Sequence, residues 1–224
     1  MRYLDWARAI EINRNALTRV VAEIFALLGV VSGGTVDYLP RKLYLAAERL
    51  LRPAESALRR LIVIAARGLV VKPIAKRPMP KGLVIMHKGS KIKPFRLFDR
   101  RKTFDFIGTE NPLFVKVRTY EDNPFNLFTS VFQSPPVEED DGPNAVYLCR
   151  RLAAATHALE TLPRQAMRLA RWKARRKRLE RPKFKYPLRP GPPPGHREKP
   201  AMEVDFVLQE CHALAWDVFK EDSS

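Results

Sequence analysis

The sequence has little cysteine and no long apolar run. Its 224 residues include two cysteines, Cys149 and Cys211, too few for the disulfide framework of small secreted proteins. The best apolar runs, at 24–31 and 61–66, fall far short of the roughly 20 residues that span a bilayer. The first residues of the chain carry two acids where a secretory signal needs an unbroken apolar core. We therefore expect a cytoplasmic protein with reduced thiols and no transmembrane segment.

Motifs that fix a reaction are also missing. The chain contains no glycine-rich phosphate loop, no nucleophile elbow and no HExxH zinc sequence. Cys149 and His157 lie about 12 Å apart along one predicted helix, too far to share a zinc ion. Cys211 and His212 are neighbours and point to different faces. We predict no catalytic residue, no metal ligand and no cofactor, although an active site assembled from distant residues would leave no local trace in the sequence.

Positive charge is abundant, and it is concentrated in two blocks. Lysine and arginine number 41 against 24 acidic residues, which gives a net charge of +17. Residues 67–102 hold 12 basic residues and one acid, Asp99, and residues 164–199 hold 14 basic residues and two acids. The rest of the chain is mildly acidic. Blocks of one sign favour a polyanionic partner, so these two cationic blocks are expected to select it.

Helical periodicity dominates the first part of the chain. Apolar residues recur at three- and four-residue steps over 3–31, and the Ser-Gly-Gly sequence that follows is expected to end this helix. A proline suits the first turn of a second helix over 40–51. Pro53 then opens a third predicted helix, which Gly68 closes as a left-handed cap. Residues 1–68 therefore indicate an N-terminal helical unit.

The middle of the chain, residues 69–142, has a different composition. Nine prolines lie between 73 and 143, and eight of the 12 phenylalanines lie between 95 and 132. Such a segment does not favour long helices. Alternating patterns at 83–87 and 113–120 are typical of short strands, and an acidic linker follows them. We expect an irregular, extended segment that is rich in proline and phenylalanine, with short strands at most.

Helix returns in the last part of the chain. A helix beginning after Asn144 is broken or kinked at Pro163 and continues as a basic helix to about residue 181. The seven prolines of 182–200 predict an extended, polyproline-like stretch. A last helix over 202–220 is expected to dock on the helix pair before it. The fold class is therefore mainly α, and residues 143–224 form a C-terminal helical hairpin with a long basic helix and a proline-rich loop.

The basic helix carries the candidate binding site. Cations that neutralise phosphates release counterions, which supplies affinity that does not depend on sequence. Trp172, Phe184 and Tyr186 are suited to stack on unpaired bases, unless Trp172 is a core residue and the charges are simply solvated. The predicted phosphate contacts are Arg168, Arg171, Lys173, Arg175, Arg176, Arg178, Lys183 and Lys185.

These patterns favour a non-catalytic protein that binds nucleic acid, DNA or RNA, with little sequence preference. The alternative is a helical adaptor whose cationic segments grip an acidic protein or an anionic membrane surface. Both hypotheses share one premise. The two cationic blocks must be open to solvent and must converge on one partner.

Three segments of the chain resemble an uncharacterised family of basic bacterial proteins. They are RPAESALRRLIVIAARGL at 52–69, LPRQAMRLARWKARRKR at 162–178 and GPPPGHREKPAMEVDFVLQECHALA at 191–215, together about a quarter of the chain. The resemblance implies a bacterial, cytoplasmic protein. The family has no assigned activity, so the resemblance transfers no functional residue to this sequence.

Overall fold

The structure is mainly helical, as the sequence predicts. The computed structural model describes residues 5–30, 34–72, 94–99, 142–177, 187–188 and 191–221. Within these ranges the helices are α1 (Trp6–Leu28), α2 (Arg41–Ala65), α4 (Val146–Glu160), α5 (Leu162–Lys177) and α6 (Glu203–Glu221). The strand patterns at 83–87 and 113–120 lie outside the described residues.

Both ends of the chain belong to one compact unit. Met1–Asp99 and Pro143–Ser224 form this unit, and Arg100–Gly142 forms a second one. All the helices named above lie in the first unit, so the predicted N-terminal and C-terminal helices share a single core.

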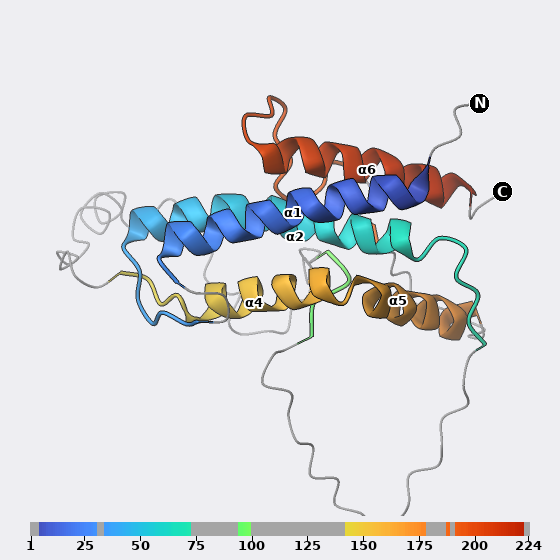
Figure 1. Cartoon of the computed structure of the whole chain (residues 1–224), viewed down its shortest axis with the longest axis horizontal. Coiled ribbons are helices and arrows are strands. Elements are labelled where there is room, and N and C mark those ends of the chain that lie inside the picture. The colour runs from blue at the N-terminus through green and yellow to red at the C-terminus, as the bar shows by residue number, and fades with distance from the viewer. Residues whose placement is uncertain are drawn as a thin grey trace, which may run out of the picture. The chain divides into compact units, whose positions relative to one another are not determined.

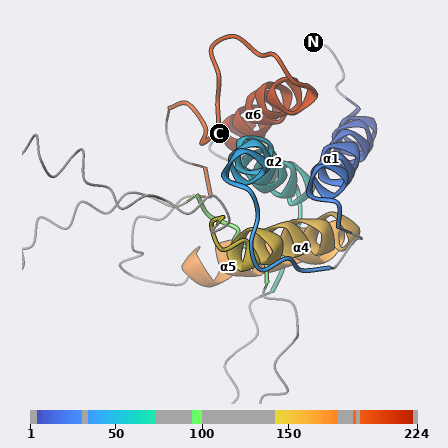
Figure 2. The same cartoon turned by 90° about the vertical axis from the view of Figure 1, so that its left-hand side faces the viewer.

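α2 is the central helix of this unit. It contacts α1, α4, α5 and α6. Figure 1 shows α6 above α2 with α4 and α5 below it, and the end-on view of Figure 2 shows α1 at its side. Every residue from 53 to 64 is buried. A helix buried on all sides is normally apolar all round, but this one includes Glu55, Arg59 and Arg60, whose charges therefore need partners inside the fold.

α2 continues through Pro53, where the sequence predicted a boundary between two helices. That prediction was wrong, because tertiary packing holds the helix together at a residue that lacks a backbone N–H and usually interrupts helices. Pro53 is buried, and Gly195 lies directly against it. A Cβ added to Gly195 would come within 2.8 Å of the Pro53 backbone nitrogen, and Gly195 has a positive φ of +85°. Only glycine fits this position without strain.

Local capping fixes the ends of α1. The Asp5 side chain accepts a hydrogen bond from the Arg8 backbone N–H at 3.1 Å, as an N-cap should. The helix ends at Leu28, three residues earlier than predicted, because Gly29 adopts a left-handed conformation with φ 63°. Its N–H donates to the Ala26 carbonyl, which completes the C-terminal cap.

The predicted break is present but lies two residues before Pro163, at Thr161: α4 ends at Glu160, and α5 begins at Leu162 and holds Pro163 in its first turn. The predicted docking of the last helix on this pair was wrong. α6 packs on α2 and α1, and among the described helices it contacts neither α4 nor α5. Apolar side chains of α6 such as Val204 and Leu208 are buried, whereas Phe206 is exposed.

A buried polar link joins α6 to α1. The Asn13 amide donates to the Glu210 carboxylate at 3.1 Å, and the Cys211 thiol donates to the Asn13 side-chain oxygen at 3.3 Å. The loop before α6 also differs from the prediction. Residues 191–200 turn at Gly191 and Gly195, both with positive φ, where an extended polyproline stretch was expected.

Candidate nucleic-acid interface

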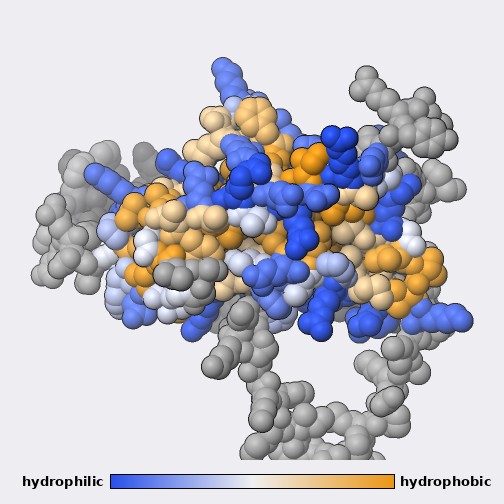
Figure 3. All heavy atoms as spheres, viewed as in Figure 1, coloured by the Kyte–Doolittle hydropathy of each residue, from blue (hydrophilic) through white to orange (hydrophobic). Residues whose placement is uncertain are grey.

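One side of α5 presents a row of exposed arginines. The apolar residues Leu162, Ala166, Leu169 and Ala170 are buried, which turns the opposite face of the helix outward. The exposed arginines on that face follow a four-three-four spacing, and we call them the arginine stripe: Arg164, Arg168, Arg171 and Arg175. At 1.5 Å per residue the stripe is about 16 Å long. Hydrophilic side chains project where α5 runs along the lower edge of Figure 3.

In the described part of the chain, no acidic side chain neutralises the stripe. α5 contains no acidic residue. Among the residues that the structure describes, Arg164, Arg171 and Arg175 form no ion pair with a carboxylate. The Arg175 side chain donates to the Arg171 backbone carbonyl at 3.3 Å, a contact that leaves its charge uncompensated. The stripe can therefore attract an external anion.

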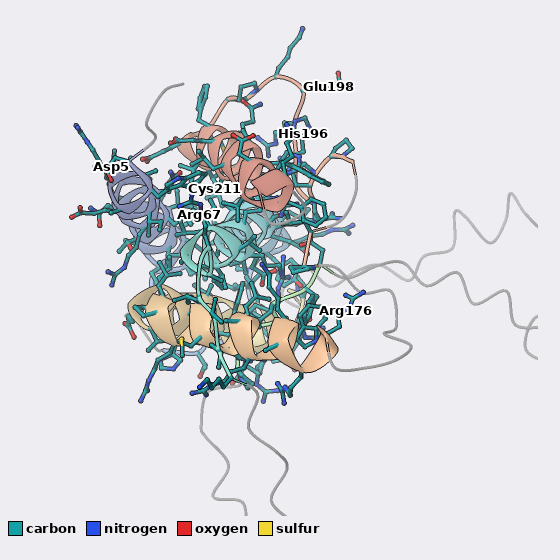
Figure 4. The ribbon with its side chains drawn as sticks, turned by 90° about the vertical axis from the view of Figure 1, so that its right-hand side faces the viewer. Asp5, Arg67, Arg176, His196, Glu198 and Cys211 are labelled. Carbon is teal, nitrogen blue, oxygen red and sulfur yellow. The ribbon has the colours of Figure 1, made fainter. Side chains whose placement is uncertain are left out.

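The predicted site residues differ in their surroundings. Arg171 and Arg175 are exposed, and Arg168 is exposed while donating to the Phe95 carbonyl at 2.8 Å. Lys173 is half-buried, and so is Arg176, whose guanidinium lies 5.3 Å above the Trp172 ring. Figure 4 shows Arg176 pointing away from the helices around α2. The predicted contacts Arg178, Lys183 and Lys185 lie outside the described residues.

The sequence prediction missed one member of the stripe, Arg164. Its spacing of four, seven and eleven residues to the other three is the helical signal that identifies it. The predicted contacts were assigned from the density of positive charge along the basic helix. The structure instead orders its exposed arginines into a single row.

Trp172 is less available for base stacking than predicted. Its ring is half-buried and packs against Phe98, with ring centroids 4.8 Å apart and planes tilted by 57°. Because the Arg176 guanidinium also lies near the ring, Trp172 already has two partners within the fold. The other predicted stacking residues, Phe184 and Tyr186, lie outside the described residues.

The two cationic blocks meet at this contact. Residues 94–99 belong to the first block, and they contact α5 in the second block through Phe98 and through the bond from Arg168 to Phe95. Arg96 is exposed next to this contact. Asp99, the only acid of the first block, is 8% exposed and therefore turned inward. In this part of the interface the cations face solvent and the acid does not.

Asp99 is held by two buried arginines of α2. Its carboxylate accepts from Arg59 at 3.2 Å and from Arg60 at 3.4 Å. Arg60 is fully buried, and in the described part of the chain its other bonds go to the neutral partners Ser56 and His212. Burial lowers the pKa of Arg60, and the charge of Asp99 opposes that shift. Asp99 is thus the carboxylate that compensates the Arg60 charge.

Glu55 extends this buried ion-pair network to α4. Its carboxylate accepts from Arg59 at 3.2 Å and from Arg151 at 2.9 Å. Burial disfavours the charged form of Arg151, but Glu55 and Glu48 outweigh that effect and raise its pKa. These residues were not predicted from the sequence. The arginine pair within the apolar stretch ALRRLIVIA was the available signal.

His212 and Cys211 complete the surroundings of Arg60. His212 Nδ1 accepts from Arg60 Nε at 3.1 Å, which requires an unprotonated nitrogen. Burial and the Arg60 and His196 charges lower the pKa of His212. Burial raises the pKa of the Cys211 thiol far above its usual range, so the thiol is a poor nucleophile. No group of three or more metal-ligating side chains in the described ranges is arranged to hold a metal ion.

Comparison with known proteins adds no relative. No protein-family model, curated protein or solved structure matches this chain. Within the described part of the chain, no helix combines the length and apolar character needed to cross a membrane.

Proposed function

We propose that this protein binds nucleic acid without catalysis and with little sequence preference, and that the arginine stripe of α5 follows the phosphate backbone. One observation carries the proposal. Four exposed guanidinium groups lie in a row on a helix that contains no acidic residue. Phosphate contacts of this kind supply affinity that is independent of sequence.

The length of the stripe matches several phosphates. A row of about 16 Å corresponds to roughly five nucleotide steps at about 3.4 Å per step of one strand. The bond from Arg168 to the Phe95 carbonyl orients that guanidinium without neutralising it, since a carbonyl carries no net charge. All four members can therefore attract phosphate.

The surroundings of the stripe favour nucleic acid over a membrane surface. A helix that lies in a membrane interface inserts its apolar face among the lipids. The apolar face of α5 is buried in the fold. None of the exposed large apolar residues in the described ranges belongs to α5. α5 could therefore bind a membrane surface only through its charge, without the apolar insertion that normally accompanies such binding. Binding to a phosphate backbone does not need an apolar face.

A salt series measures the proposed binding directly. Fluorescence anisotropy with labelled single-stranded and duplex oligonucleotides gives the dissociation constant at each salt concentration. If the stripe contacts about four phosphates, the slope of log affinity against log salt on duplex DNA is about −3.6. The triple variant R164E/R171E/R175E should lose about three units of that slope and at least about tenfold in affinity at low salt.

A matched variant separates the stripe from the overall charge of the chain. Arg41, Arg49 and Arg52 are exposed arginines of α2, so R41E/R49E/R52E changes the net charge by the same amount. We expect this variant to keep most of the affinity and slope. Equal losses in both triple variants would leave only non-specific attraction and would reject the stripe as the binding site.

The same variants test the alternative partners. Flotation with anionic vesicles reports binding to a membrane surface, and co-sedimentation with a polyglutamate chain reports binding to an acidic protein. Retention on vesicles or polyglutamate, without binding to oligonucleotides, would support the adaptor hypothesis and contradict the function proposed here.

A further inference from the structure

Residues 94–99, Pro-Phe-Arg-Leu-Phe-Asp, lie on the helices as a bound peptide would. Phe95, Leu97 and Asp99 are buried at 4, 6 and 8% exposure, Pro94 and Arg96 are exposed, and Phe98 is half-buried. Alternate burial of this kind is the pattern of an extended chain lying on a surface. We call residues 94–99 the docked segment.

Side chains from two helices hold the backbone of the docked segment. Arg168 of α5 donates to the Phe95 carbonyl at 2.8 Å, and Arg59 of α2 donates to the Arg96 carbonyl at 3.0 Å. These bonds depend on the path of the backbone and not on side-chain identity. Recognition of an extended peptide commonly combines such backbone bonds with places for alternate side chains.

The side chains of the docked segment supply selectivity. The Arg59 guanidinium lies 5.4 Å from the centre of the Phe95 ring, and Phe98 packs on Trp172. The Asp99 carboxylate is shared between Arg59 and Arg60. Within the described ranges Glu55 pairs with Arg59 and not with Arg60, so an occupant without a carboxylate would leave the buried Arg60 with no carboxylate among these residues. An occupant must therefore bring both apolar side chains and an acid.

We propose that Arg59, Arg60, Arg168 and Trp172 form a recognition site for an extended protein segment of the form aromatic–x–leucine–aromatic–aspartate, filled here by the chain's own residues 95–99. The ligand class is a partner protein segment of this chemistry. Each contact described above is non-covalent and can be made equally by a separate chain. The resident segment competes through its effective concentration, which covalent linkage within one chain can raise to the order of millimolar.

A trans-binding experiment tests this site in the full-length chain. The variant F95S/L97S/D99N removes the side chains of the resident segment. A fluorescein-labelled peptide of residues 94–99 with blocked ends should bind this variant at least about tenfold more tightly than it binds the wild-type chain, because the competitor in cis is weakened. Helical circular dichroism checks that the variant is folded.

The peptide's own chemistry supplies the controls. A peptide with asparagine in place of the aspartate should bind roughly thirtyfold more weakly, because it leaves the arginine pair without its carboxylate. A scrambled peptide should not bind. Equal binding of the aspartate and asparagine peptides, or no binding to the folded variant, would overturn the proposal.

A measurement on the wild-type chain keeps the test valid if the triple variant unfolds. A peptide carrying a photoreactive phenylalanine at the position of Phe98 is added to wild-type protein at millimolar concentration, where it competes with the resident segment. Crosslinks should map to the fragment of α5 that contains Trp172, and excess unlabelled peptide should abolish them. Crosslinks elsewhere, or none, would reject the site. The experiment contains no nucleic acid, so its outcome is independent of the function proposed for the arginine stripe.

Discussion

The arginines of α2 and α5 are the same residue type in opposite environments. Arg59 and Arg60 are buried and compensated by Glu55 and Asp99. Arg171 and Arg175 of the stripe face solvent. Both pairs belong to helices with apolar faces, and what separates them is the presence of carboxylates: Glu55 one turn away on α2, and Asp99, which lies 39 positions after Arg60. The comparison shows that net charge overstates the charge that is available to a partner.

The two environments also predict opposite responses to substitution. A buried charge that loses its partner keeps its desolvation penalty, whereas an exposed charge is hydrated with or without a partner. Changes within the buried network should therefore affect stability, and changes in the stripe should affect binding.

Removal of the Asp99 carboxylate should have the largest effect. D99A leaves Arg60 buried without a carboxylate, and we expect a loss of about 3–5 kcal/mol in the free energy of unfolding. Urea denaturation followed by circular dichroism measures it. The double variant R60M/D99L removes both charges and should recover most of the stability, because Arg59 keeps Glu55. If D99A has the same free energy of unfolding as the wild type, the Arg60–Asp99 pair contributes nothing to stability. Buried and exposed arginines would then not differ in their response to substitution.

A substitution at Gly195 tests whether close packing in the interior, as well as buried charge, determines the stability of the fold. G195A introduces a Cβ against the Pro53 backbone at a residue with positive φ, and it should cost about 2 kcal/mol. The matched control is G191A, since Gly191 also has a positive φ but a Cβ there meets no atom within 4 Å. Thermal denaturation should rank G195A below G191A. The reverse order would contradict the close approach to Pro53.

Acid should weaken the packing around Arg60 through His212. The pKa of His212 is lowered from 6.5 in the folded chain, so the unfolded chain binds more protons as the pH falls through this range. The contribution of His212 to stability is therefore fully present above its unfolded pKa and is lost as the pH falls towards its folded pKa.

A pH series of denaturation midpoints tests the His212 contribution. H212Q should flatten the profile as the pH falls below about 6.5, because glutamine can accept from Arg60 without titrating. H157Q, at the exposed His157 of α4, serves as the control and should keep the wild-type profile. If H157Q flattens the profile and H212Q does not, the assignment to His212 is wrong.

Substitutions in the stripe should have the smallest effect on stability. R171Q/R175Q removes two exposed charges, and we expect a change within about 0.5 kcal/mol in the free energy of unfolding. The same variant should lower the salt slope of oligonucleotide binding by about two units. A large loss of stability would show that Arg171 and Arg175 stabilise the fold. The exposed arginines of α5 would then not differ from the buried arginines of α2.

Much of the helical architecture could be predicted from local patterns. The periodicity of α1, the break next to Pro163 and the left-handed glycine after α2 follow from three- and four-residue spacing and from glycine and proline chemistry. The continuity of α2 at Pro53 could not be predicted in this way. It depends on Gly195, which is remote in sequence and close in space.

The candidate site was predictable to a similar degree. The exposed arginines of α5 follow helical spacing, and the prediction named three of the four members of the stripe. The roles of Arg168 and Trp172 toward residues 94–99 were not predictable, because no local pattern indicates which extended segment docks on which helix. The buried network was missed for the same reason, since the carboxylates that pair with Arg60 and Arg151 come from other parts of the chain.

The position of α6 has a consequence for how the chain is synthesised. α6 covers α1 and α2, although its residues 203–221 are translated long after theirs. Until the ribosome has released α6, the apolar surface of α2 that faces α6 stays open to the solvent and to other nascent chains. We therefore expect a chain stopped before residue 203 to recruit chaperones or aggregate, and the native fold to form only after α6 has left the exit tunnel.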